Sequence, residues 1–306
     1  MATLNTSVSF GGLTLKNPVL TASGTFGYGL EFSPYGDLTK LGGLVVKGLS
    51  LKPREGNPMP RIAETPCGML NAIGIQNVGV EVFLRNKLPL LPWRETAVIA
   101  NLYACSAEEF GDLAGLFAGE EGVAALEVNV SCPNVKEGGA AFGADPSQIE
   151  RVTAAVRKRC PKKPVIVKLS PNVTDIVVAG RAAADGGADI LSAINTLTGM
   201  AVDVRTRKPR LANVVGGLSG PAVKPVGLRC VWQLARALPL PVIGIGGIST
   251  AEDALEYMLV GAHAVQVGTA SFMRPDVAFT LVEAIEALGA SLGLSSLDEY
   301  RGSLKT

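Results

Sequence analysis

The chain has 306 residues, of which 47% are hydrophobic and 18% are charged, so a large apolar core is expected and intrinsic disorder is excluded. The 28 Lys and Arg residues nearly balance the 27 Asp and Glu residues, which argues against a nucleic-acid-binding protein or one that binds acidic membranes. Five scattered cysteines without a CxxC pair indicate a cytoplasmic protein, with neither disulfides nor a metal or iron–sulfur site in this chain. No segment has the ~20 apolar residues of a membrane span, and residues 1–6 lack the features of a signal peptide.

Eight short β-branched segments recur along the chain, and their continuous apolarity is typical of strands buried on both faces of a parallel sheet. They cover residues 19–23, 44–47, 97–102, 125–130, 165–169, 190–195, 242–245 and 264–267. Helix starts at Ser106, Asp145 and Thr250 fall between strands, and a last apolar helical stripe covers residues 277–288. This alternation predicts an α/β fold in which residues 1–306 form a single (β/α)8 TIM barrel domain.

Two further features modify the barrel. Residues 8–15, with Gly11 and Gly12 at the turn, predict an N-terminal β-hairpin that caps its bottom. Long insertions follow strands 2, 4 and 6, at residues 49–77, around residues 136–139, and at residues 197–223. They leave the ends of the strands where barrel enzymes build their sites, so we interpret the first and third as lids over the mouth. The basic run at 205–210 is more typical of a solvated loop than of an anion site.

Polar side chains or glycines stand at the last positions of all eight predicted strands. Individually they are common turn residues, but buried strands have no structural need for lysines and asparagines at one shared end. We therefore interpret the set as the rim of a functional site. The rim consists of Ser23, Lys47, Asn101, Asn129 with Cys132, Lys168, Asn195, the pair Gly246 and Gly247, and Gly268 with Thr269.

The glycines after the last two strands predict a phosphate site, because glycine lets backbone N–H groups approach an anion next to a helix N-terminus. Ser249 replaces the third glycine of a dinucleotide fingerprint, so the stretch does not match that motif. The phosphate site favours a phosphorylated cofactor, and the residues around it suit a flavin. Lys168 near the flavin N1/C2 region would stabilise the negative charge of the reduced ring, and Lys47 would contact both the flavin and an anionic substrate.

The segment 129–134, Asn-Val-Ser-Cys-Pro-Asn, carries the candidate base. A lone cysteine is most often a small buried apolar residue. The only histidine, His263, lies just before the last predicted strand, at the end opposite the rim, which favours a surface or structural role. A Ser–His–Asp triad and a multi-histidine metal site are therefore disfavoured, and Cys132 becomes the candidate proton acceptor.

The rim motifs resemble those of the class 1 dihydroorotate dehydrogenases over nearly the whole chain. The matching segments are 21–24, 46–48, 71–75, 129–134, 167–169, 194–196, 217–220, 246–247 and 267–269. The resemblance implies oxidation of (S)-dihydroorotate to orotate in pyrimidine biosynthesis, with hydride passing from C6 to N5 of FMN and the C5 proton passing to Cys132. It implies FMN contacts from Ser23, Lys47, Gly48, Asn101, Asn129, Lys168, Ile194, Gly220, Gly246, Gly247, Gly268 and Thr269. It implies substrate contacts from Lys47, Asn71, Ala72, Ile73, Gly74, Ile75, Asn129, Asn134, Asn195 and Thr196.

Loops 134–139 and 206–213 are more similar to the NAD-linked class 1B subtype than to the fumarate-linked class 1A subtype. In class 1B a separate subunit carries FAD and a [2Fe–2S] cluster, and the resemblance favours a homodimer of this chain within a heterotetramer. The membrane-bound class is disfavoured, because it uses serine as the base and has an N-terminal extension. Three alternatives stay open: a fumarate-linked enzyme, a pyrimidine-reducing flavoenzyme, against which Asn134 argues, and a non-redox aldolase or isomerase barrel that binds a phosphorylated metabolite.

Overall fold

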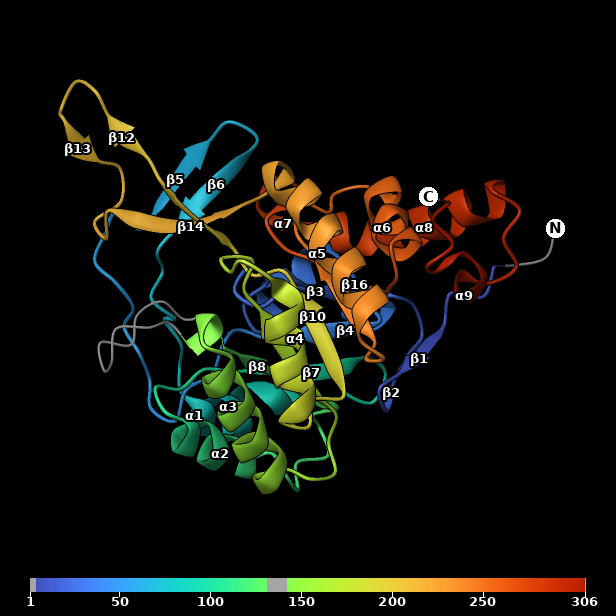
Figure 1. Ribbon diagram of the computed structural model, residues 1–306, viewed down its shortest axis with the longest axis horizontal. Helices are drawn as coiled ribbons and strands as arrows, with labels where there is room; N and C mark the ends of the chain where they lie inside the picture. Colours follow the sequence, from blue (N-terminus) through green and yellow to red (C-terminus); the bar gives the residue numbers. More distant parts are fainter. Residues whose placement is uncertain (1–3, 131–141, 306) are drawn as a thin grey trace.

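Eight parallel strands close into a barrel at the centre of the computed structural model, which describes residues 4–130 and 142–305 (Figure 1). The predicted (β/α)8 barrel is thus confirmed. Around the barrel the strands follow the order β10 (Ile190–Ala193), β15 (Val242–Ile245), β16 (Ala262–Val267), β3 (Val19–Thr21), β4 (Gly43–Val45), β7 (Ala97–Leu102), β8 (Ala125–Asn129) and β9 (Val165–Leu169), and β9 closes the ring by pairing with β10.

Strands β3, β4 and β10 end two residues earlier than the sequence predicts, so Ser23, Lys47 and Asn195 lie in the loops that follow them. The backbone explains the difference at Lys47, whose N–H donates to the carbonyl of Gly27 in a loop (2.8 Å). These three side chains of the rim are thereby carried just beyond the sheet, whereas Asn101, Asn129 and Lys168 lie within the last residues of their strands.

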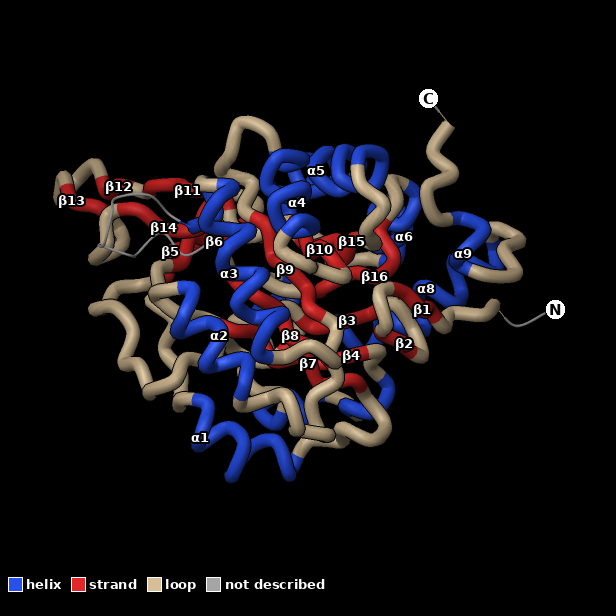
Figure 2. The backbone as a smooth tube through the Cα atoms, turned by 60° about the horizontal axis from the view of Figure 1, so that its bottom comes forward, coloured by secondary structure: helices blue, strands red, loops and turns tan. Residues whose placement is uncertain are grey.

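Helices surround the strands on the outside of the barrel (Figure 2). The longer ones are α2 (Ala107–Gly115), α3 (Pro146–Arg159), α4 (Ile176–Asp185), α5 (Lys224–Ala237), α6 (Ala251–Leu259) and α8 (Val277–Ser291); the short ones are α1 (Val80–Val82), α7 (Ala270–Met273) and α9 (Leu297–Tyr300). The predicted N-caps are confirmed, since the side chains of Ser106, Asp145 and Thr250 each accept a first-turn backbone N–H. Within the described ranges, no helix is both long and apolar enough to cross a membrane.

The hairpin of β1 (Val8–Phe10) and β2 (Leu13–Leu15) closes the bottom of the barrel, as predicted. Its apolar side chains pack against the lowest inward layer of the strands, which includes Ile99, Ile166 and Ile243. His263 lies inside β16 rather than before it, and its ring centroid is 5.4 Å from that of Phe10. Burial, followed by the charge of Arg301, lowers the pKa of His263 to about 4. The histidine therefore lies at the end opposite the rim, as the sequence indicates.

The first and third insertions do not remain loops, because they fold together into an antiparallel sheet. Its strand order is β11 (Leu197–Met200), β14 (Val215–Ser219), β6 (Gly68–Asn71) and β5 (Ile62–Thr65), and the small ribbon of β12 (Val202–Asp203) and β13 (Lys208–Pro209) extends it. We call this sheet and its ribbon the arm (residues 62–71 and 197–219). Both views show the arm on the side away from the hairpin (Figures 1 and 2). The basic residues 205–210 are exposed on it. The insertion after β8 falls largely on residues 131–141, which lie outside the described residues.

Candidate active site

The C-terminal ends of the barrel strands bring most of the predicted residues to one mouth. Asn129 pairs in register with Lys168 across β8 and β9, and Asn101 pairs with Glu127 across β7 and β8. Residues 23, 47–48, 194–196, 246–247 and 268–269 follow the other strand ends. Cys132 and Asn134 lie outside the described residues, so their geometry stays a prediction.

The loop after β15 has the backbone shape of an anion cradle. Gly246 and Gly247 have φ values of 125° and 72°, a region that L side chains rarely adopt. A Cβ on Gly247 would lie 2.8 Å from Cβ of Lys224 and 3.0 Å from the carbonyl of Gly220. Glycine is therefore required here by conformation and by space, as in loops whose backbone N–H groups bind anions.

Two side chains that the sequence did not single out hold this loop. The buried hydroxyl of Tyr257 in α6 donates to the carbonyl of Gly246 (2.8 Å). Asp253 accepts the backbone N–H groups of Ser249 and Thr250 (2.8 and 2.9 Å) and pairs with Lys224 at 2.6 Å. Burial alone would raise the pKa of Asp253, but the hydrogen bonds from Lys224, Ser249 and Thr250 bring it below its usual value. The glycine loop is thus fixed from its helix side.

The arm is joined to the same side of the mouth. Thr269 Oγ1 donates to Ser219 Oγ of β14 at 2.8 Å. Gly220 has a φ of 102°, and a Cβ there would lie 2.7 Å from Cα of Gly68. The glycines after β14, β15 and β16 therefore form one connected region.

Lys47 follows β4 with its side chain directed toward the loop after β3. A Cβ built on Gly24 would lie 3.8 Å from Lys47 Nζ. Burial, and secondly the charge of Arg61, lowers the pKa of Lys47. The ammonium group is therefore poorly solvated, and a neighbouring anion would favour its charged form.

The floor of the mouth is polar. Glu127 is fully buried and accepts a hydrogen bond from Asn101 Nδ2 at 2.7 Å. Gln266 Nε2 donates to the same carboxylate at 2.7 Å, and Lys168 Nζ lies 3.8 Å from it. Glu127 and Gln266 were missed in the sequence, because each is a single polar residue inside an apolar strand. Strand periodicity could have shown them, since Glu127 lies two residues before Asn129 and Gln266 two before Gly268.

The predicted substrate segment, residues 71–75, runs from the end of β6 toward the mouth and is held by two asparagines. Asn57 Nδ2 donates to the backbone carbonyl of Ala72 at 2.9 Å, and Asn77 Nδ2 donates to the carbonyl of Ile75 at 2.8 Å. Gly74 has a φ of 75°, and a Cβ there would lie 2.6 Å from the side chain of Asn57. The segment is a tightly packed turn with a required glycine.

Two of the other predicted substrate residues contact each other. Asn195 Nδ2 donates to Asn129 Oδ1 at 3.1 Å, and Asn195 Oδ1 accepts the backbone N–H of Thr196 at 2.9 Å. The carbonyl of Thr196 in turn accepts from Asn172 Nδ2 at 2.9 Å. The structure thus joins β8 and β10 through carboxamides and adds Asn172, which the sequence did not indicate.

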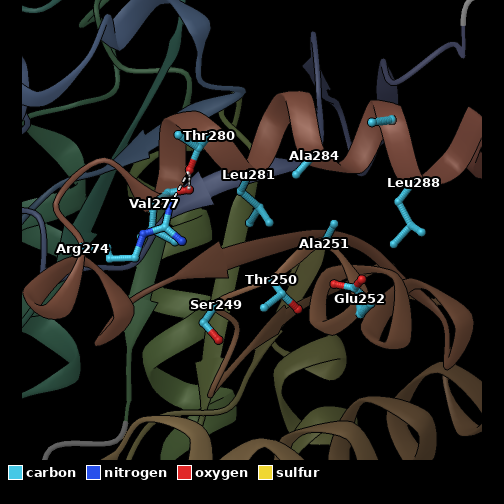
Figure 3. A pocket seen from close by; sticks show the side chains of 11 residues that line it. Ser249, Thr250, Ala251, Glu252, Arg274, Val277, Thr280, Leu281, Ala284 and Leu288 are labelled. Atoms are coloured by element: carbon cyan, nitrogen blue, oxygen red, sulfur yellow. Dashed lines mark hydrogen bonds between the residues drawn. The ribbon is translucent and has the colours of Figure 1, made fainter.

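A separate hollow of about 450 Å³ lies between the start of α6 and the side of α8 (Figure 3). None of the predicted site residues lines it. Its polar groups include Ser249, which is bonded to Asp253, and Arg274, which reaches Thr280. Among the described residues, no group of three or more His, Cys, Asp or Glu side chains is arranged to hold a metal ion. The mouth, and not this hollow, therefore gathers the predicted chemistry.

Comparison with known proteins identifies the family and supports the fold. The family model for dihydroorotate dehydrogenase matches residues 5–288. The chain is 70% identical over 302 residues to the "Dihydroorotate dehydrogenase B (NAD(+)), catalytic subunit" of Solidesulfovibrio magneticus, covering 99% of each chain. It is 68% identical to the protein of the same name from Maridesulfovibrio salexigens, again covering 99% of each. A crystal structure of DHODH from Eimeria tenella in complex with ferulenol superposes with a TM-score of 0.80 at 22% identity, covering 98% of this chain and 88% of that one, which shows the shared fold. The chain belongs to the dihydroorotate dehydrogenase family.

Proposed function

We propose that this protein is the catalytic subunit of a NAD-linked dihydroorotate dehydrogenase, which oxidises (S)-dihydroorotate to orotate in de novo pyrimidine biosynthesis. The observation that carries the proposal is the ring of polar strand ends completed by a glycine cradle with positive φ values, in a chain 70% identical to a protein of that name. Lysines and carboxamides on one side and a backbone anion site on the other suit a phosphorylated flavin with a small anionic substrate beside it.

The family is flavin-dependent, and the residues of the mouth fit FMN. The side-chain oxygens of Asn101 and Gln266 are buried and have no hydrogen-bond partner among the described residues, so a ligand with N–H donors would satisfy them. The phosphate would be held by Gly220, Gly246, Gly247, Gly268 and Thr269. The ring system would be held by Ser23, Lys47, Gly48, Asn101, Asn129, Lys168 and Ile194. When bound, FMN supplies the acceptor for the hydride that leaves C6 of dihydroorotate.

The substrate would lie against the turn at residues 71–75, with Asn129, Asn134, Asn195 and Thr196 around its ring. Orotate and dihydroorotate carry a carboxylate and an imide, which need a cation and paired donors and acceptors. Lys47 supplies a poorly solvated cation, and the Asn129–Asn195 pair presents carboxamides on the adjoining strands. Cys132 would remove the C5 proton as the general base.

Electrons would leave this chain through a separate subunit that carries FAD and a [2Fe–2S] cluster and reduces NAD. The names of the relatives, which give NAD(+) and a catalytic subunit, support this assignment. We further propose a homodimer within that heterotetramer. Exposed apolar side chains on the arm, at Ile62, Met200, Val202, Val204 and Val215, support an association surface there.

Anaerobic flavin bleaching tests the activity. The purified protein should be yellow, and (S)-dihydroorotate should bleach its visible band. NAD should be reduced only when the partner subunit is added, whereas fumarate and a quinone should be poor acceptors. Colourless protein that cannot be loaded with FMN would contradict the proposal, and rapid reoxidation by fumarate without a partner would contradict the NAD assignment.

The base is tested by comparing two cysteine variants. Cys132→Ala should retain FMN and slow its bleaching by about a hundredfold or more, which is the usual contribution of a positioned base. Cys105→Ala removes an exposed thiol after β7 and should leave the rate unchanged. Equal bleaching rates in the wild type and Cys132→Ala would reject the role of Cys132.

A further inference from the structure

Glu127 is a carboxylate in the lumen of the barrel. It lies in the middle of β8 and has no exposed surface. Because side chains alternate along a strand, Glu127 shares its face with Asn129 two residues later, so both point into the barrel. The inward layer just below it is apolar, with Val45, Ile99 and Ile166 packed on the hairpin. The charge therefore lies at the boundary between the packed core and the mouth.

Side chains from four other strands converge on this carboxylate. Oε1 accepts from Asn101 Nδ2 of β7 at 2.7 Å, and Lys168 Nζ of β9 lies 3.8 Å from the same oxygen. Oε2 accepts from Gln266 Nε2 of β16 at 2.7 Å and from Ser192 Oγ of β10 at 3.1 Å. A buried charge is tolerated only when it is paired and hydrogen-bonded, and these four contacts meet that requirement.

The carboxylate determines how its two carboxamide partners are oriented. A carboxylate only accepts hydrogen bonds, so Asn101 and Gln266 must each turn their NH2 group toward Glu127. Their oxygens then face elsewhere, and both are buried without a partner among the described residues. A Cβ on Gly48 would lie 3.0 Å from Asn101 Oδ1, which places this acceptor beside a glycine of the rim. Glu127 thus fixes two ambiguous carboxamides with their oxygens turned away from it, and the oxygen of Asn101 lies beside the rim.

The same carboxylate opposes the charge of Lys168. An ammonium group that would stabilise negative charge on a reduced flavin does so less strongly when a carboxylate lies 3.8 Å away from it. Little of this effect is screened by salt, because the side chains of both Lys168 and Glu127 are almost completely buried.

We infer that Glu127 is a positioning residue of the flavin site, which orients Asn101 and Gln266 as acceptors and keeps the flavin midpoint potential low by opposing Lys168. The inference rests on the proposed function, since it takes FMN as the ligand of the mouth. Glu127 acts through its neighbours.

Glu127→Gln in the full-length holoprotein removes the charge. The neutral variant can stay hydrogen-bonded, because the Gln266 carboxamide can rotate its oxygen toward the new NH2 group and the Ser192 hydroxyl can rotate to accept. The variant therefore changes the orientation of Gln266 as well as the charge, and Glu127→Asp below keeps the charge. The midpoint potential should shift to a more positive value, by about tenfold in the two-electron equilibrium constant or about 30 mV. Ser192→Ala is the matched control, since it removes a contact to the same carboxylate without changing charge, and its potential should equal that of the wild type.

Glu127→Asp tests the orientation independently. It keeps the charge but shortens the reach by one methylene, so the hydrogen bonds to Asn101 and Gln266 lengthen. FMN affinity, titrated on the apoprotein, should fall by about tenfold, while the potential of the bound flavin shifts less than in Glu127→Gln. The wild type and Ser192→Ala serve as references in the same titration.

The outcomes distinguish a failure of the inference about Glu127 from a failure of the proposed function. An unchanged potential in Glu127→Gln, or unchanged FMN affinity in Glu127→Asp, overturns the inference while leaving a dihydroorotate-bleached wild type as proposed. If Glu127→Gln does not fold, the affinity of Glu127→Asp decides. A purely structural role would lower the melting temperature of both variants without moving the potential, and that result also overturns the inference. A wild type that cannot bind FMN overturns the proposed function as well.

Discussion

Tyr257→Phe isolates one hydrogen bond that shapes the glycine cradle. The Tyr257 side chain is fully buried in α6, and its hydroxyl lies 2.8 Å from the carbonyl of Gly246 and 3.2 Å from that of Ile245. One hydroxyl donates one proton, and the Ile245 carbonyl already accepts the N–H of Ile194 at 3.0 Å. Tyr257→Phe therefore removes the hydrogen bond to the Gly246 carbonyl. Gly246 is held in a backbone conformation that only glycine adopts easily.

The expected cost follows from the partial burial of that carbonyl. Phenylalanine fills the same space, so no cavity is created. The loss of one partly buried hydrogen bond with its acceptor left in place amounts to about 1 kcal/mol. Urea unfolding of the apoprotein should show a lower midpoint with an unchanged m value, because the exposed area on unfolding is the same. FMN should also bind more weakly, since the cradle loses a constraint.

Tyr35→Phe is the matched control, because the Tyr35 side chain is 55% exposed, and it should change stability by less than about 0.5 kcal/mol. A Tyr257→Phe protein as stable as this control, with the same FMN affinity as the wild type, would refute the reasoning about the cradle.

Three further variants test other parts of the structure. Gly74→Ala places a Cβ 2.6 Å from Asn57 at a φ of 75° and should raise the KM for dihydroorotate without releasing FMN; an unchanged KM in steady-state assays would contradict the role of the turn. Thr250→Ala removes the capping box of α6 and should lower the free energy of unfolding by about 1 kcal/mol in urea titrations, and no change would contradict the capping role. His263 has a pKa lowered to about 4, so the unfolded chain binds the proton more readily, and the stability contributed by the neutral ring is present above pH ~6.5 and lost as the pH falls toward 4. His263→Gln should flatten that part of the stability–pH curve, and an unchanged slope would exclude the assignment.

Local patterns were sufficient to predict much of the fold. The eight apolar segments, the helix caps at Ser106, Asp145 and Thr250, and the Gly11–Gly12 turn are properties of neighbouring residues, so periodicity and capping chemistry identify them. The gathering of the polar strand ends was also predicted, because parallel strands in a barrel carry their C-terminal ends to one rim. The position of His263 at the opposite end was also predicted, although it lies within β16 and not before it.

Contacts between residues far apart in the chain were decided only by the tertiary structure. The two insertions pair through Gly217 and Asn71 into an antiparallel sheet, which their short, glycine-rich strands did not indicate. The network around Glu127 joins five strands, and no single strand shows a pattern from which it could be derived.

Residue type and strand direction are local properties, so the pattern of the chain was enough to predict candidate residues for the chemistry and the rim on which they stand. Only the folded chain shows their partners: Asn129 contacts Asn195, which was also a predicted residue, whereas Thr269 contacts Ser219 and Lys168 contacts Glu127, which were not. These contacts depend on how barrel closure brings distant strands together. The charge balance beneath the mouth arises only from that closure.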